Sequence, residues 1–138
     1  SAAVIWGISP DEYMQRADPW PLNPQGELLL GLKIENKRAL ENVERTVSVP
    51  GIAFAEWGPG DMAMSFGYAP TPENWQRPEL QDARNPVFDA CRANGVHFLE
   101  AANAEDVTAK IDEGVRVIAG GDAQIAEIGR AHAQANPG

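Results

Sequence analysis

Apolar runs of strand length alternate with helical apolar spacing along most of this chain. Four runs have the length and composition of buried strands: 28–35, 52–57, 96–101 and 115–119. Apolar residues at helical spacing follow, in the stretches 39–47, 80–91, 107–111 and 123–135. This alternation of strand and helix, four times over, predicts an α/β fold with a parallel sheet and right-handed crossovers.

The segment before the first long run reads differently. Residues 2–8 are apolar and lead to Ser9, which we expect to cap a short helix that begins at Pro10 and ends near residue 17. Three prolines then fall within 18–26, so we predict an irregular loop there, without helix or paired strand, anchored by Trp20.

Two further details concern the main elements. The run 28–35 is almost continuously apolar, which predicts a strand covered on both faces. Pro86 falls inside the helical pattern of 80–91, so it either kinks that helix or begins a second one.

The 138 residues have the size of one domain. Four β/α units are half of a (β/α)8 TIM barrel, and a self-contained open sheet between helices is the alternative. We divide the chain into an N-terminal segment and loop (1–26), four strands with their helices (27–121) and a terminal helix (122–138). The open sheet gives no reason for the apolar start of the chain, so the half-barrel is preferred.

Composition and charge narrow the class of protein. A hydrophobic share of 43% and a charged share of 22% are typical of a soluble globular domain. The formal net charge of -9 argues against nucleic-acid binding, which needs a clustered basic surface. No apolar run approaches the roughly 18 residues of a membrane span, and the first residues lack signal-peptide features. The single cysteine, Cys91, is expected to be a buried thiol, which fits a cytoplasmic protein.

Two acids follow two consecutive predicted strands. Glu35 ends the first run and Asp61 comes just after the second, so a parallel sheet places both at one rim. Two converging carboxylates suit Mg²⁺ or Mn²⁺, and a 2-oxo acid chelating that metal would be stabilised as its enolate when a proton leaves. The backbone N–H groups of Gly60 and Asp61 would receive the substrate carboxylate. The purely structural alternatives are that Lys33, on the same strand face, neutralises Glu35 and that Asp61 caps a helix.

The motifs around these acids resemble a known family. The pattern I-E at 34–35, V-P-G-I at 49–52, G-P-G-D-M-x-x-S-x-G at 58–67 and V-x-x-A-C-x-x-x-G-V at 87–96 resembles the 4-hydroxy-2-oxoheptanedioate aldolases. These are pyruvate-dependent class II aldolases related to the citrate lyase β subunit. The resemblance implies that Glu35 and Asp61 bind the divalent metal. It also implies that Gly58, Pro59 and Gly60 hold the carboxylate of pyruvate.

The resemblance implies a reaction and partners as well. The chain would supply the last four units of the barrel of a carbon-carbon lyase, which makes or cleaves the bond between pyruvate, or a related 2-oxo acid, and an aldehyde. The histidine base and the carboxylate-binding arginine of the family belong to the other half-barrel, so we expect this chain alone to be inactive. The terminal helix 122–138 would pack on a neighbouring subunit of a homo-oligomer. Trp57 is expected to wall the pocket, and His97 and His132 to have structural or surface roles.

One departure leaves alternatives open. Lys33 stands where the family commonly has a glutamine that reaches toward substrate, so we assign Lys33 as a substrate contact. A lysine there also admits a class I mechanism, in which burial lowers its pKa and it forms a Schiff base. Two further alternatives are a non-catalytic metal-binding or assembly fragment and a CoA-thioester lyase of the citrate lyase β type.

Overall fold

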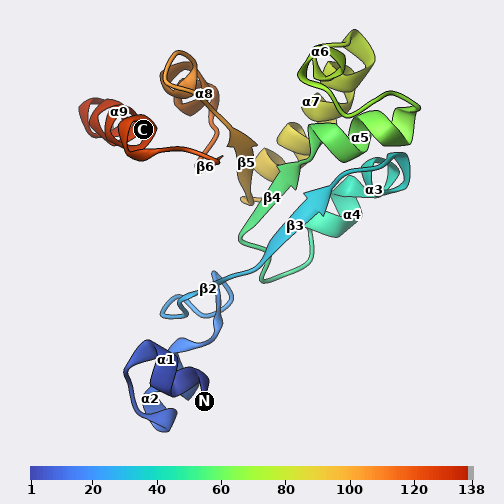
Figure 1. The fold of residues 1–138 in the computed structure, drawn as a ribbon. Coiled ribbons are helices and arrows are strands. Elements are labelled where there is room, and N and C mark those ends of the chain that lie inside the picture. The colour runs from blue at the N-terminus through green and yellow to red at the C-terminus, as the bar shows by residue number, and fades with distance from the viewer. Residues whose placement is uncertain (137–138) are drawn as a thin grey trace.

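The computed structural model describes residues 1–136 and contains a parallel sheet of four strands in the order β3-β4-β5-β6 (Figure 1). The strands are β3 (Gly31–Ile34), β4 (Phe54–Trp57), β5 (His97–Ala101) and β6 (Val117–Ala119). Each strand pairs with the next one along the chain, and every pairing is parallel. The predicted alternation of strands and helices is confirmed, whereas the four strands form an open sheet and do not close into a barrel.

Helices cover one face of this sheet. The connecting helices are α3 (Lys37–Glu41), α4 (Val43–Val47), α5 (Pro59–Phe66), α6 (Pro72–Trp75), α7 (Pro78–Ala93), α8 (Val107–Glu113) and α9 (Ala123–Ala135). The longest of them, α7, packs against β4 and β5. Ile34, Trp57 and Phe98 point into the core between sheet and helices, where Cys91 is also fully buried. Burial raises the pKa of the Cys91 thiol to about 11, as expected for an inert structural cysteine.

The alternate side chains of the strands form a second surface, which we call the open face. None of its residues is fully buried: Gly31, Lys33, Phe54, Glu56, His97, Leu99, Ala101, Val117 and Ala119. The Phe54 ring lies directly over Gly31, where a Cβ atom would come within 2.1 Å of the ring. A glycine on β3 thus makes room for an aromatic side chain from β4.

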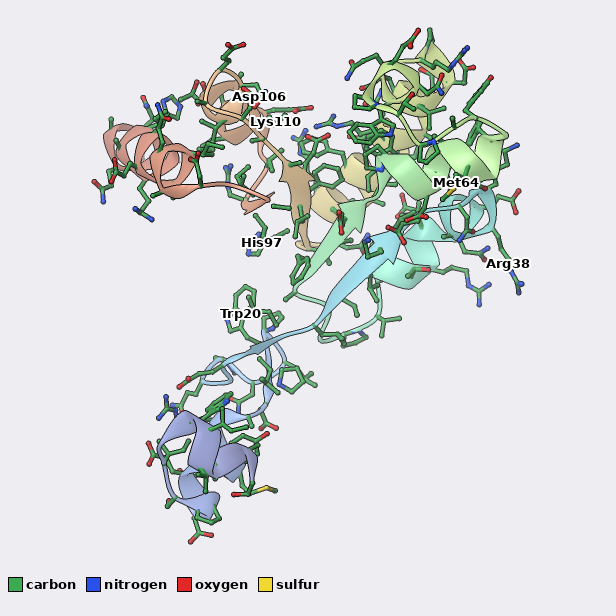
Figure 2. The ribbon with its side chains drawn as sticks, viewed as in Figure 1. Trp20, Arg38, Met64, His97, Asp106 and Lys110 are labelled. Atoms are coloured by element: carbon green, nitrogen blue, oxygen red, sulfur yellow. The ribbon has the colours of Figure 1, made fainter. Side chains whose placement is uncertain are left out.

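The N-terminal segment lies beyond the lower end of the sheet (Figure 1). It contains α1 (Ala2–Trp6) and α2 (Pro10–Arg16), which pack on each other. The predicted cap is confirmed, because the Ser9 hydroxyl accepts a hydrogen bond of 3.1 Å from the Glu12 N–H. Trp20 stacks on His97, with ring centroids 5.6 Å apart and planes at 6°, so it anchors this segment to the sheet (Figure 2).

The prediction that 18–26 holds no paired strand is wrong for two residues. The short strand β1 (Pro19–Trp20) pairs in parallel with β2 (Leu28–Leu29). A proline is accommodated because the bond at this point is donated by the Leu28 N–H to the Asp18 carbonyl, 3.1 Å away, and needs no N–H from Pro19.

The run 28–35 also differs from its prediction. It is divided between β2 and β3, and Leu28, Leu29 and Leu30 are 39%, 60% and 48% exposed instead of covered on both faces. The physical reason is that Leu28 and Leu29 belong to the separate two-stranded sheet of β1 and β2, outside the four-stranded sheet that the helices cover.

Three helices depart from the expected boundaries. The helix expected over 39–47 is divided at Asn42 into α3 and α4, and the short helix α6, which Thr71 caps, lies outside the predicted helical stretches. Asn103 accepts bonds from Glu105 and Asp106 in the turn before α8 and does not cap the helix itself. For Pro86, the structure selects one uninterrupted helix, α7.

The terminal helix 122–138 is observed as α9, with Asp122 as its cap, and residues 137–138 lie outside the described part. No helix among residues 1–136 combines the length and the apolar character required to cross a membrane.

Candidate functional site

The end of β3 carries the first two candidate residues. Because Ile34 is buried in the core, its neighbours Lys33 and Glu35 both project from the opposite side of the sheet, as their spacing predicts. The Lys33 Nζ lies 2.6 Å from the Glu35 Oε1. The side chain of Glu35 is only 22% exposed, whereas that of Lys33 is 56% exposed. The mutual neutralisation considered as a structural alternative is therefore present.

Glu56 is a third charged residue at this place, and the sequence reasoning missed it. It lies directly opposite Lys33 in the register of β3 and β4, with its Oε2 3.7 Å from the Lys33 Nζ. The available signal was an acid inside the apolar run F-A-E-W, two residues before Gly58 and hence on the same face as it.

The charge around Lys33 contradicts the premise of the Schiff-base alternative. The hydrogen bond to Glu35 is the main cause of a raised Lys33 pKa, the charge of Glu56 adds to it, and that of Asp61 makes the smallest contribution. A lysine that forms a Schiff base needs a lowered pKa, so that the neutral amine is available. The expected lowering by burial is wrong, because Lys33 is exposed and lies beside the carboxylates of Glu35 and Glu56.

Gly58 determines where the Glu35 carboxylate lies. A Cβ atom at residue 58 would come within 2.4 Å of the Glu35 Oε1 and 2.6 Å of its Cγ. The absence of a side chain thus opens a cradle that the Glu35 side chain fills. Any larger residue at position 58 would displace the carboxylate.

The G-P-G-D stretch forms the start of α5. Gly58 is the N-cap, Pro59 is the first helical residue and Asp61 lies in the first turn, with an exposed side chain. Proline suits this position because the first N–H groups of a helix have no partner within it. No side chain caps α5, so its first N–H groups are directed away from the helix at the rim where Glu35 lies.

The remaining predicted residues lie elsewhere. Trp57 is 3% exposed and packs in the core on the helix-covered side, opposite the face that carries Lys33 and Glu56. His97 lies at the start of β5, at the other end of the strands from Glu35. His132 on α9 has its Nε2 2.6 Å from the Asp112 Oδ1 and so joins α9 to α8.

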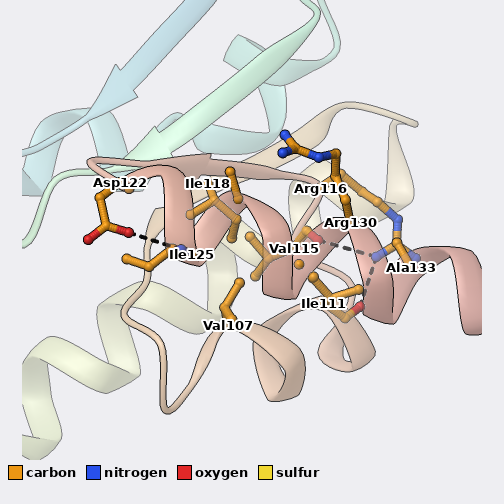
Figure 3. A pocket seen from close by; sticks show the side chains of 12 residues that line it. Val107, Ile111, Val115, Arg116, Ile118, Asp122, Ile125, Arg130 and Ala133 are labelled. Atoms are coloured by element: carbon orange, nitrogen blue, oxygen red, sulfur yellow. Dashed lines mark hydrogen bonds between the residues drawn. The ribbon is translucent and has the colours of Figure 1, made fainter.

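A separate cavity of about 400 Å³ lies between α8, β6 and α9 (Figure 3). Its walls are mainly apolar, including Val107, Ile111, Ile118, Ile125 and Ala133. None of the candidate site residues lines it. The apolar side of α9 thus faces α8 of the same chain.

Comparison with known proteins gives the geometry a context. Residues 11–126 match the model of the HpcH/HpaI aldolase/citrate lyase family. The chain belongs to this family. The match spans most of the chain and includes both acids and the glycines between them.

Individual proteins are also similar to this chain over part of their length. A 2-keto-3-deoxy-L-rhamnonate aldolase of Salmonella typhimurium is 35% identical over 89 residues, which are 64% of this chain and 28% of the relative. The crystal structure of an HpcH/HpaI aldolase/citrate lyase family protein from Burkholderia cenocepacia has a TM-score of 0.67 and 27% identity, over 97% of this chain and 48% of that one. The citrate lyase beta subunit of M. tuberculosis, complexed with oxaloacetate and magnesium, has a TM-score of 0.60 and 17% identity, over 72% and 50% of the two chains. The chain therefore spans about half the length of these two solved structures and less of the rhamnonate aldolase.

The two candidate metal ligands, Glu35 and Asp61, follow neighbouring strands of the sheet. Glu35 in its cradle and Asp61 offer hard carboxylate oxygens, which Mg²⁺ and Mn²⁺ prefer. Within residues 1–136, no group of three or more His, Cys, Asp or Glu side chains is placed to hold a metal. The donor set fits an ion that takes two protein ligands and completes its coordination with water or substrate.

Proposed function

We propose that this chain supplies the metal- and carboxylate-binding part of an aldolase that makes or cleaves the bond between pyruvate, or a related 2-oxo acid, and an aldehyde. The observation that carries the proposal is the placement of Glu35 over Gly58, on the strand end beside the one that leads to Asp61. The family relatives named as aldolases support the reaction class. The citrate lyase relative bound to magnesium and to oxaloacetate, a 2-oxo acid, supports the choice of ligands.

In this proposal the acids hold a divalent ion, Mg²⁺ or Mn²⁺. A bound ion would polarise the carbonyl of the 2-oxo acid and so favour loss of the neighbouring proton. The carboxylate of the acid is received by the N–H groups of Gly60 and Asp61 at the start of α5. Gly58 and Gly60 carry no side chain, so they leave that approach free of bulk, and Pro59 begins the helix between them.

Lys33 is proposed as a substrate contact that remains protonated. Its ammonium group lies beside Glu35 and opposite Glu56, so it donates hydrogen bonds at the rim and adds positive charge there. Trp57 supports the loop from the core side and forms no part of the wall on the open face.

The proposal assigns the general base and the carboxylate-binding arginine to an N-terminal half-barrel. That half would pair with the exposed strand edges and complete the (β/α)8 barrel. We also propose that the complete enzyme is a homo-oligomer, with α9 near the subunit contact.

The test measures retro-aldol cleavage of a 4-hydroxy-2-oxo acid by the chain alone and by the chain completed with an N-terminal half-barrel, each with Mg²⁺ or Mn²⁺. We expect activity from the complete barrel only, and a loss of at least about 100-fold in kcat/KM for Glu35→Gln and for Asp61→Asn, because each removes a ligand charge. The matched controls Glu41→Gln and Asp82→Asn change exposed acids on α3 and α7 and should leave activity unchanged. Cleavage by the isolated chain, or full activity of either ligand variant, would contradict the proposal.

The same material separates the alternatives. Titration with Mn²⁺ in the presence and absence of pyruvate should show mutual strengthening of binding if both ligands share the site. A fragment with a purely structural metal would show no such coupling. A CoA-thioester lyase would cleave a carbon-carbon bond only in a substrate that carries the CoA thioester.

A further inference from the structure

Glu35 and Asp61 lie on two separate segments of the chain. Two hydrogen bonds join these segments, one before and one after the acids in sequence. On the first side, the Gly58 N–H donates to the Ile34 carbonyl over 3.4 Å, which extends the β3–β4 pairing past the strand ends. On the second side, the Lys37 N–H donates to the Ser65 hydroxyl oxygen over 3.1 Å. Glu35 lies between residues 34 and 37, and Asp61 lies between residues 58 and 65. We call this closed arrangement the carboxylate frame.

The second bond of the carboxylate frame has a clear local cause. Lys37 is the first residue of α3, where a backbone N–H has no partner within the helix. The Asn36 side chain caps the same helix, but it accepts a hydrogen bond from the Ala39 N–H over 2.9 Å and does not bond the Lys37 N–H. Ser65, 28 residues away on α5, supplies the acceptor.

A second contact holds the same two elements together. The Lys37 Nζ lies 4.5 Å from the centroid of the Phe66 ring, a distance at which an ammonium ion is attracted to the aromatic face. Phe66 in turn packs against the core. The helix that follows Glu35 is therefore fixed to the last turn of the helix that carries Asp61.

We propose that Ser65 is a positioning residue that fixes the separation of Glu35 and Asp61, and through it the affinity for the divalent ion. This inference rests on the proposed metal-binding role of the two acids. Without the Ser65 hydroxyl, the backbone of Lys37 has no hydrogen bond to α5 and only the side-chain contact between Lys37 and Phe66 remains on this side, so α5 and the start of α3 can move apart and carry the two acids with them. Ser65 acts through the backbone of Lys37 and needs no contact with the ion.

The test is a titration of the full chain with Mn²⁺, in which electron paramagnetic resonance measures the concentration of the free ion. We expect Ser65→Ala to weaken binding by roughly tenfold, the lower end of what loss of a group supporting metal ligands causes. Ser65→Thr keeps the hydroxyl acceptor and should bind within about threefold of the parent. The matched control is Ser48→Ala. It also removes a serine hydroxyl that is bonded to the backbone, because the Ser48 hydroxyl at the end of α4 donates to the Arg45 carbonyl over 3.0 Å. It should leave Mn²⁺ affinity unchanged.

Unfolding in urea without metal provides the second readout, because a purely structural role would lower stability and leave affinity unaltered. If Ser65→Ala does not fold, Ser65→Cys, a similar shape with a weaker acceptor, takes its place and should show an intermediate loss. Parent-like affinity in the folded Ala or Cys variant, or equal losses for Thr and Ala, would overturn the inference and leave the proposed function intact. Failure of the parent itself to bind Mn²⁺ would overturn both.

Discussion

At the scale of single residues, Gly58 shows how the site depends on a missing side chain. The Glu35 carboxylate occupies the space that a Cβ atom at position 58 would need. By contrast, a Cβ atom at Gly60 would meet only the ring of Pro70, at an ordinary contact distance of 3.7 Å. Two glycines of one motif therefore differ in their tolerance of alanine.

Gly58→Ala should weaken Mn²⁺ binding by at least about tenfold, because the added methyl group displaces a metal ligand. Gly60→Ala is the matched control for metal affinity, since it leaves Glu35 in place. Isothermal titration of both variants with Mn²⁺ checks this. Equal affinities for the two variants would show that the cradle has no influence on the ligand.

The charged residues of the site were predictable from sequence to different degrees. A spacing of two placed Lys33 and Glu35 on one face of a strand, and the structure confirms this. Glu56 escaped notice because its partner is on another strand, and the register that pairs it with Lys33 is a tertiary property. Trp57 was misplaced because its closeness in sequence to Gly58 says nothing of the face to which it points.

At the scale of elements, an ion network joins α7, β5 and α8. The guanidinium of Arg84 is buried between Phe88 and Phe98 and makes paired hydrogen bonds of 2.8–2.9 Å with Glu100 on β5 and Glu113 at the end of α8. Lys110 extends the network with its Nζ 3.5 Å from the Oε2 of Glu100. A buried cation with two carboxylates fixes the orientation of the helices against the sheet.

This network makes stability depend on pH. The hydrogen bond from Arg84 lowers the pKa of Glu113 below its ordinary value of 4.5. A lowered carboxyl pKa adds stability that is complete above the ordinary value and is lost as the pH falls through the folded-state pKa. Glu113→Gln should therefore be less stable than the parent at pH 7, by about 1 kcal/mol because the carboxylate is partly exposed, and the difference should vanish at low pH.

Urea unfolding of both proteins between pH 7 and pH 3 measures this. Glu127→Gln, an exposed change on α9, serves as the control and should follow the parent throughout. A difference between Glu113→Gln and the parent that persists at pH 3 would assign the effect to packing instead of charge.

The positions of the elements were better predicted than their boundaries. All four main strands were found from their apolar runs, because burial against helices demands that composition. The sequence did not predict the division of the helix at Asn42 or the short helix α6. Both depend on local side-chain hydrogen bonds, such as that from the Asn42 amide to the Arg38 carbonyl. The helical spacing of apolar residues does not predict such hydrogen bonds.

At the scale of the whole molecule, the sheet has two unpaired edges, at β3 and β6. Apolar side chains gather beside one of them, where Leu28, Leu29 and Leu30 are exposed. Exposed apolar edge strands favour pairing with further strands. Closure into a barrel stays a prediction, because the four strands of residues 1–136 form an open sheet.

Addition of an N-terminal half-barrel should therefore protect the backbone amides of β3 and β6 from hydrogen exchange, and protect those of β4 and β5 much less. Exchange followed by mass spectrometry, with and without the added half, measures this. β4 is the internal control, since it already has a partner on each side. Uniform protection of all four strands would indicate general stabilisation and would argue against pairing at the edges.

The charges at the rim also imply an order of events. Three carboxylates, those of Glu35, Glu56 and Asp61, face the single ammonium group of Lys33, which leaves two net negative charges. This field attracts a divalent cation from a distance and repels an anionic 2-oxo acid. Arrival of the cation removes the net charge and with it the repulsion. In this chain, without the arginine proposed for the other half-barrel, we therefore expect the cation to bind before the organic acid.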